Sequence, residues 1–190
     1  MAEKDAFAER GRSLEDDYFR KRDRELVDKM REAAVAGQAR ADMGAKTGIT
    51  DPELLEQLQA LGFTPETVTL LPLMPVLQVA WADRDISAAE RTLIVKLART
   101  RGVAEGSAAD RQLADWIDRR PADHVFMHAT RLIRAMLETA PGKADLTADD
   151  LVKQAEAIAA ASGGIFGVLN RISLEERQLL NDLTQQLKGR

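Results

Sequence analysis

The residues best suited to chemistry lie in the stretch ADRDISAAE, which ends at Glu90. Its three acids, Asp83, Asp85 and Glu90, are oxygen donors that could hold a divalent cation weakly. An EF-hand loop ending at Glu90 would need acids at its first and third positions, where the chain has apolar residues, and glycine at its sixth, where it has Arg84. The stretch is therefore not an EF-hand, and Arg84 could neutralise the acids in place of an ion.

The pattern around Glu90 recurs near the end of the chain, and both copies have a structural explanation. Ser-x-x-Glu is the capping box that begins a helix, and an apolar residue before it packs against the first turn. The matching residues are Ile86, Ser87, Glu90, Arg91 and Leu93 in the first copy and Ile172, Ser173, Glu176, Arg177 and Leu179 in the second. The repeat predicts two related helical hairpins, and it favours helix starts over a metal site.

The two histidines, His124 and His128, are four residues apart, which places both on one face of a helix. A zinc-protease motif would need glutamate directly after the first histidine, where the chain has Val125. Since the chain has only these two histidines, a third protein ligand would have to be a distant carboxylate, so a polar helix edge is the favoured interpretation.

Composition excludes several classes of protein. The chain has 190 residues, no cysteine and a formal net charge of −4, which gives no electrostatic case for nucleic acid binding. It has no apolar run long enough to span a membrane and no secretory signal at its start. No cofactor motif and no convergent catalytic set is found. We therefore expect a cytoplasmic, non-enzymatic protein without a cofactor.

Residues 1–31 carry 18 charged side chains, with opposite charges repeatedly four residues apart. Such pairs stabilise exposed helices. We predict a charged helix over residues 1–36, a glycine-containing linker over 37–50 and a compact domain over 51–190. The sparse apolar residues of the helix are the candidates for binding a protein partner or a second copy. They are Leu14, Tyr18, Phe19, Leu26 and Met30.

From Thr50 onward, helix starts recur and no strand-like alternation is found, so the predicted class is all-α. Asp51 and Pro52 begin one helix, and Thr147 caps a later one. The run LLPLMPVLQVA is apolar nearly all round, which predicts a buried central helix. In the helix that follows, Leu93, Ile94, Leu97 and Ala98 are predicted to share the core face.

An apolar helix leading into this acidic stretch resembles TerB-like proteins of the tellurite-resistance family. The matching residues are Ala82, Asp83, Asp85, Ile86, Ser87 and Glu90, with Arg84 where the family usually has glycine. The resemblance covers residues 51–190. It implies a bundle of about seven helices, a stress-linked role, no established catalysis and an acidic patch suspected of binding metal.

The N-terminal segment is similar to the inhibitory helix of F-type ATPase inhibitor proteins. Glu15, Asp16, Tyr18, Phe19, Arg20 and Glu25 fit that pattern. We therefore expect a helical interaction module with a stress-response role, and the alternative is an ATPase regulator that acts through its N-terminal helix.

Overall fold

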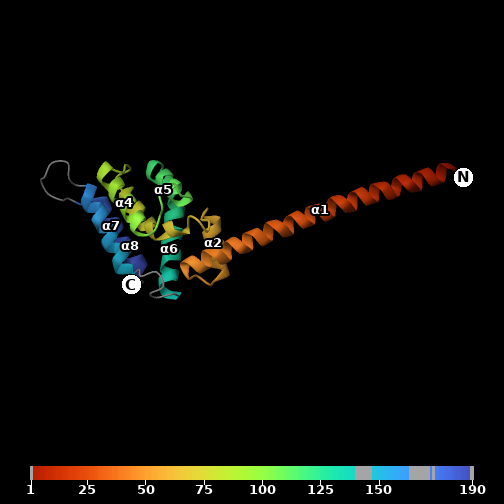
Figure 1. The fold of residues 1–190 in the computed structure, drawn as a ribbon. Helices are drawn as coiled ribbons and strands as arrows, with labels where there is room; N and C mark the ends of the chain where they lie inside the picture. The colour runs from red at the N-terminus through yellow and green to blue at the C-terminus, as the bar shows by residue number, and fades with distance from the viewer. Residues whose placement is uncertain (1, 140–146, 163–171, 173, 189–190) are drawn as a thin grey trace. The chain divides into compact units, whose positions relative to one another are not determined.

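The computed structural model describes residues 2–139, 147–162, 172 and 174–188, with side chains described from Tyr18 onward. Every regular element within these ranges is a helix, so the predicted all-α class is confirmed. The chain divides into two compact units, Met1–Ala39 and Arg40–Arg190. Figure 1 labels the helices in chain order.

The first unit is formed by most of helix α1, which runs from Ala2 to Thr47. Every side chain from Tyr18 to Val35 is exposed. The helix is held locally: Arg24 Nε donates to the Arg20 carbonyl at 3.3 Å, and the Arg22 guanidinium lies 5.9 Å from the Tyr18 ring centre. A charged helix at this place was predicted, but it runs past its predicted end at Ala36.

The predicted linker over residues 37–50 is wrong for residues 37–47, because these continue α1. Alanine, the best helix former, recurs through this segment and outweighs its glycines. Position 44 has no room for a side chain, since a Cβ atom on Gly44 would lie 2.8 Å from the Ile49 carbonyl oxygen. Gly48 ends the helix with φ +77°, and its amide donates to the Gly44 carbonyl at 2.8 Å. Met43 and Ile49 are buried, so this end of α1 belongs to the core of the second unit.

The second unit continues with short helices whose starts follow the predicted caps. Asp51 accepts a hydrogen bond from the Glu53 amide at 2.8 Å, directly before Pro52. Pro72 lies in a 3-10 helix, and Pro75 lies in the first turn of the next α-helix. The elements are α2 (Pro52–Ala60), η1 (Val68–Leu73), α3 (Met74–Ala80), α4 (Ala88–Thr100), α5 (Ala108–Asp118), α6 (Asp123–Thr139), α7 (Ala148–Ser162) and α8 (Leu174–Lys188).

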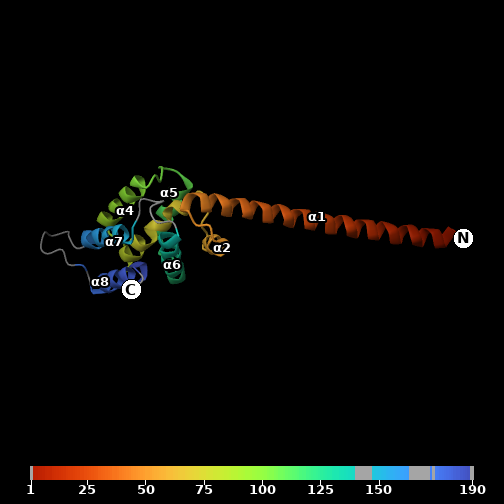
Figure 2. The ribbon, with the colours of Figure 1, turned by 90° about the horizontal axis from the view of Figure 1, so that it is seen from below.

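Helix α3 lies at the centre of the second unit. All its residues except Gln78 are buried, and it packs against η1, α4, α6, α7 and α8. Figures 1 and 2 show α7 and α8 side by side at one end of this unit. The prediction of a buried central helix is confirmed, because a helix that is apolar nearly all round must be covered on every side.

The predicted core face of α4 needs one correction. Ile94 and Ala98 are fully buried, but Leu93 is 37% exposed. Consecutive helical residues point about 100° apart, so a face centred on Ile94 and Ala98 leaves Leu93 at its edge.

Candidate functional site

The acidic turn between α3 and α4 is anchored at its start by Trp81. The Trp81 indole Nε1 donates to the Trp116 carbonyl at 2.9 Å, which ties the end of α3 to α5. The Trp116 ring meets Phe63 edge-on, with ring centres 5.6 Å apart. The hydrogen bond from Trp81 therefore holds the end of α3, from which the chain enters the acidic turn.

Arg84 adopts the left-handed conformation, with φ +68°, and no other non-glycine residue of the described chain has a positive φ. Its amide donates to the Trp81 carbonyl at 3.1 Å, which closes the turn. Side chains with a Cβ atom pay a conformational cost in this region. Glycine is the residue best suited to this position, so Arg84 places a strained residue in the middle of the acidic turn.

Glu90 forms the predicted capping box with Ser87. The Ser87 amide donates to Glu90 Oε2 at 2.8 Å, and the Glu90 amide donates to Ser87 Oγ at 3.3 Å. The Glu90 side chain is almost fully buried. Burial raises the pKa of Glu90, the hydrogen bonds from Ser87 oppose this, and the nearby charges of Glu176 and Asp83 raise the pKa further.

The repeat places a second buried glutamate near the first. Glu176 is the counterpart of Glu90, and it is also almost fully buried. Ser173 lies outside the described residues, so the capping of α8 and the symmetry of the two hairpins stay predictions. The structure thus shows that the two matching glutamates of the repeat are both buried and that their charges interact.

The three predicted metal ligands occupy different environments. Asp83 and Asp85 are exposed, whereas Glu90 is buried with its carboxylate engaged by the Ser87 amide. In the part of the chain that the structure describes, no three His, Asp or Glu side chains converge to hold a metal ion. The Ser87–Glu90 capping box accounts for the acid in the first turn of α4.

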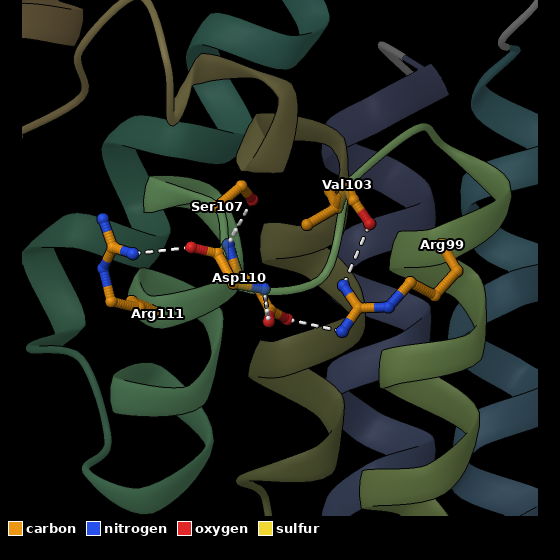
Figure 3. Close-up of polar contacts among 6 residues, drawn as sticks. Arg99, Val103, Ser107, Asp110 and Arg111 are labelled. Atoms are coloured by element: carbon orange, nitrogen blue, oxygen red, sulfur yellow. Dashed lines mark hydrogen bonds and ion pairs between the residues drawn. The ribbon is translucent and has the colours of Figure 1, made fainter.

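A polar network between α4 and α5, drawn in Figure 3, was missed by sequence reasoning. Arg99 donates to Asp110 Oδ1 at 2.7 Å and to the Val103 carbonyl at 2.9 Å. Asp110 Oδ2 accepts from the Gly106 amide at 2.8 Å, and the Asp110 amide donates to Ser107 Oγ at 3.1 Å. The Gly106 amide and Arg99 together lower the pKa of Asp110. The signal was the stretch SAAD, a cap of the same kind with aspartate as its acid.

A shallow groove of about 250 Å³ lies between α4 and α7. Its lining is mostly apolar, and its polar members are Lys96, Thr100 and Gln154. Arg101 donates to Gln154 Oε1 at 2.7 Å, so the groove is closed at one edge by a polar contact between the two helices. The exposed Leu93 contributes to this groove rather than to the core.

The predicted partner-binding residues lie on α1. Tyr18, Phe19, Leu26 and Met30 are all more than half exposed, whereas the Leu14 side chain lies outside the described set. Six of the nine large exposed apolar side chains in the described chain belong to this helix. Exposed apolar surface is therefore concentrated on α1 and sparse on the second unit.

No protein-family model matches the chain, and the comparisons with curated proteins and with solved structures found no match. None of the described helices combines the length and the apolar character needed to cross a membrane.

Proposed function

We infer that this protein is a non-enzymatic interaction module whose N-terminal helix binds a protein partner or a second copy of the chain. The observation that carries this proposal is the gathering of exposed apolar side chains on α1. Clustered exposed apolar surface is typical of an interaction site, whereas single exposed apolar residues are ordinary.

The spacing of these side chains supports one binding face. Phe19, Leu26 and Met30 are separated by seven and four residues, which brings them to the same side of a helix. Each is more than half exposed, so a partner helix or groove would bury most of their apolar surface.

Side-chain variants in the full-length protein test this proposal. Replacing Phe19, Leu26 and Met30 together by glutamine removes apolar surface and keeps good helix formers. We expect the triple variant to lose the partners, or the self-association, that cross-linking and mass spectrometry detect for the unaltered protein. Val35→Gln is the matched control, because Val35 is equally exposed but lies on the opposite side of the helix. Unchanged cross-links in the triple variant would contradict the proposal.

Truncation at Thr50 is a poor substitute for these variants. It would remove Met43 and Ile49, which are buried in the core of the second unit. A loss of binding would then report unfolding as readily as a lost interface.

A stress-linked role is the biological setting that the TerB-like resemblance suggests. The supporting features are the acidic turn before the capping box and the buried counterpart Glu176. Deleting the gene and measuring growth with potassium tellurite tests this setting. Growth equal to that of the parent strain would remove the support for a tellurite-linked role.

Regulation of an ATPase is a second candidate, favoured by the helical and exposed placement of Tyr18, Phe19 and Arg20. The full-length protein would then slow ATP hydrolysis by an isolated F-type ATPase, and the triple glutamine variant would not. No slowing by the unaltered protein would exclude this candidate.

A further inference from the structure

The exposed face of α6 carries both histidines of the chain. The buried face of this helix includes Phe126, Ala129 and Ile133, which fix it in the core. The opposite face exposes His124, Met127, His128, Arg131 and Arg134. The two imidazoles therefore stand one helical turn apart on a surface open to solvent.

This placement has the geometry of a two-point chelate. Residues four apart on a helix have Cβ atoms about 6 Å from each other, a separation that two imidazole rings can close around one ion. Because the buried face holds α6 in place, the arrangement exists before any ion binds. A preformed site keeps more of its binding free energy than one that must be ordered.

The neighbouring charges limit the number of ligands and the affinity, and the ligand atoms determine which metal ion fits. The carboxylate of Asp123 pairs with Arg120 at 2.5 Å, and it is therefore engaged rather than offered as a third ligand. Arg131 lies one turn beyond His128 and repels cations, so it should lower the affinity of the two histidines for a metal ion. Imidazole nitrogens suit copper, nickel and zinc, whereas calcium and magnesium prefer oxygen.

We propose that His124 and His128 form a surface chelate for a divalent late transition-metal ion, with water at the remaining coordination positions. By the general order of affinities for such ligands, Cu²⁺ binds more tightly than Ni²⁺ or Zn²⁺. The site is independent of the acidic turn at Asp83 and of the apolar face of α1.

Calorimetry on the untagged full-length protein tests the stoichiometry and the ligands. Titration with NiCl₂ at pH 7.5 should reveal one saturable site of micromolar affinity. His124→Ala and His128→Ala should each weaken this site at least tenfold, because either change leaves a single imidazole. Met127→Ala is the matched control on the same face, and it should bind nickel as the unaltered protein does. Equal affinity in the unaltered protein and in either histidine variant would overturn the proposal.

Thermal unfolding separates this chelate from adventitious binding. An ion that needs the folded helix stabilises the native state, so the unfolding midpoint should rise with nickel concentration and return when EDTA is added. The double variant His124→Ala/His128→Ala should lose this shift and keep its midpoint without metal, since both side chains are exposed. A shift that persists in the double variant would place the ion elsewhere and refute the site.

Discussion

Ser87 and Glu90 are joined by two hydrogen bonds that run in opposite directions across the first turn of α4. Each residue satisfies a backbone amide that the helix itself leaves unpaired. This pair lies at the end of the acidic turn, and its hydrogen bonds to the Glu90 carboxylate oppose the rise in the pKa that burial causes.

Removing the serine hydroxyl should destabilise the protein. We expect Ser87→Ala to lower the free energy of unfolding by about 1 kcal/mol, because the Glu90 amide loses its acceptor. Ser87→Gly is the control, with a cost of only a few tenths of a kcal/mol, roughly the usual value for glycine at a cap. Urea denaturation of both variants measures the difference. Equal midpoints for the unaltered protein and Ser87→Ala would show that the cap contributes nothing.

Replacing Glu90 by glutamine should change how stability depends on pH. Burial raises the pKa of Glu90 above its ordinary value of 4.5. The folded state therefore binds the proton of the Glu90 carboxyl more tightly than the unfolded state does. The contribution of this proton to the free energy of unfolding is fully present below the unfolded pKa and is lost as the pH rises through the folded pKa. Glutamine keeps an acceptor for the Ser87 amide and has no charge to bury. The free energy of unfolding of Glu90→Gln should therefore rise relative to that of the unaltered protein as the pH increases above 4.5, the ordinary pKa of glutamate.

The control for this measurement is Glu175→Gln, which removes an exposed carboxylate next to Glu176. It separates the loss of a buried charge from the change in net charge. If both variants follow the same pH profile, burial of Glu90 is not the cause of the effect.

Glycine at position 84 should stabilise the acidic turn. Arg84 holds φ +68°, and relieving the Cβ atom there should raise the free energy of unfolding by about 1 kcal/mol. The greater freedom of glycine in the unfolded chain offsets part of this gain. Arg84→Ala is the matched control, since it removes the guanidinium but keeps the strain. A stabilisation by alanine equal to that by glycine would assign the effect to charge rather than to backbone conformation.

The local chemistry of helix starts is what made the fold predictable. The caps at Asp51 and Ser87 and the proline at the start of α2 act through residues close in sequence, and all were found where the sequence places them. The exposed residues of α1 were also predictable, because charge and apolar spacing settle which side chains can be covered.

Contacts between distant residues were not predictable. At the end of α1 the Ile49 carbonyl comes close to Gly44, and the glycine alone does not reveal this approach. The bond from Trp81 to Trp116 joins residues far apart in the sequence. The burial of Glu90 likewise depends on its packing environment, which includes the charge of Glu176 on another helix.

Asparagine at position 110 should weaken the α4–α5 network in a pH-dependent manner. The Gly106 amide and then the Arg99 guanidinium lower the pKa of Asp110, so its contribution to stability is present above the unfolded pKa and is lost as the pH falls through the folded pKa. We expect Asp110→Asn to be less stable than the unaltered protein at pH 7 and the difference to close on acidification below 3.8, the ordinary pKa of aspartate. Chemical denaturation across this range measures it, and a gap that is constant with pH would exclude the charge as its source.

Amide exchange should separate the exposed part of α1 from the core. Residues 18–35 have exposed side chains throughout, so their helical hydrogen bonds are protected by little besides the helix itself. The amides of α3, whose side chains are nearly all buried, should exchange only when the second unit opens. We expect hydrogen–deuterium exchange over residues 18–35 to finish well before that over 74–80. Equal protection of both segments would contradict this prediction and would mean that α1 is covered in solution. Diluting the sample would then identify the cause. Self-association is reversed by dilution, whereas burial of the helix within the fold is not.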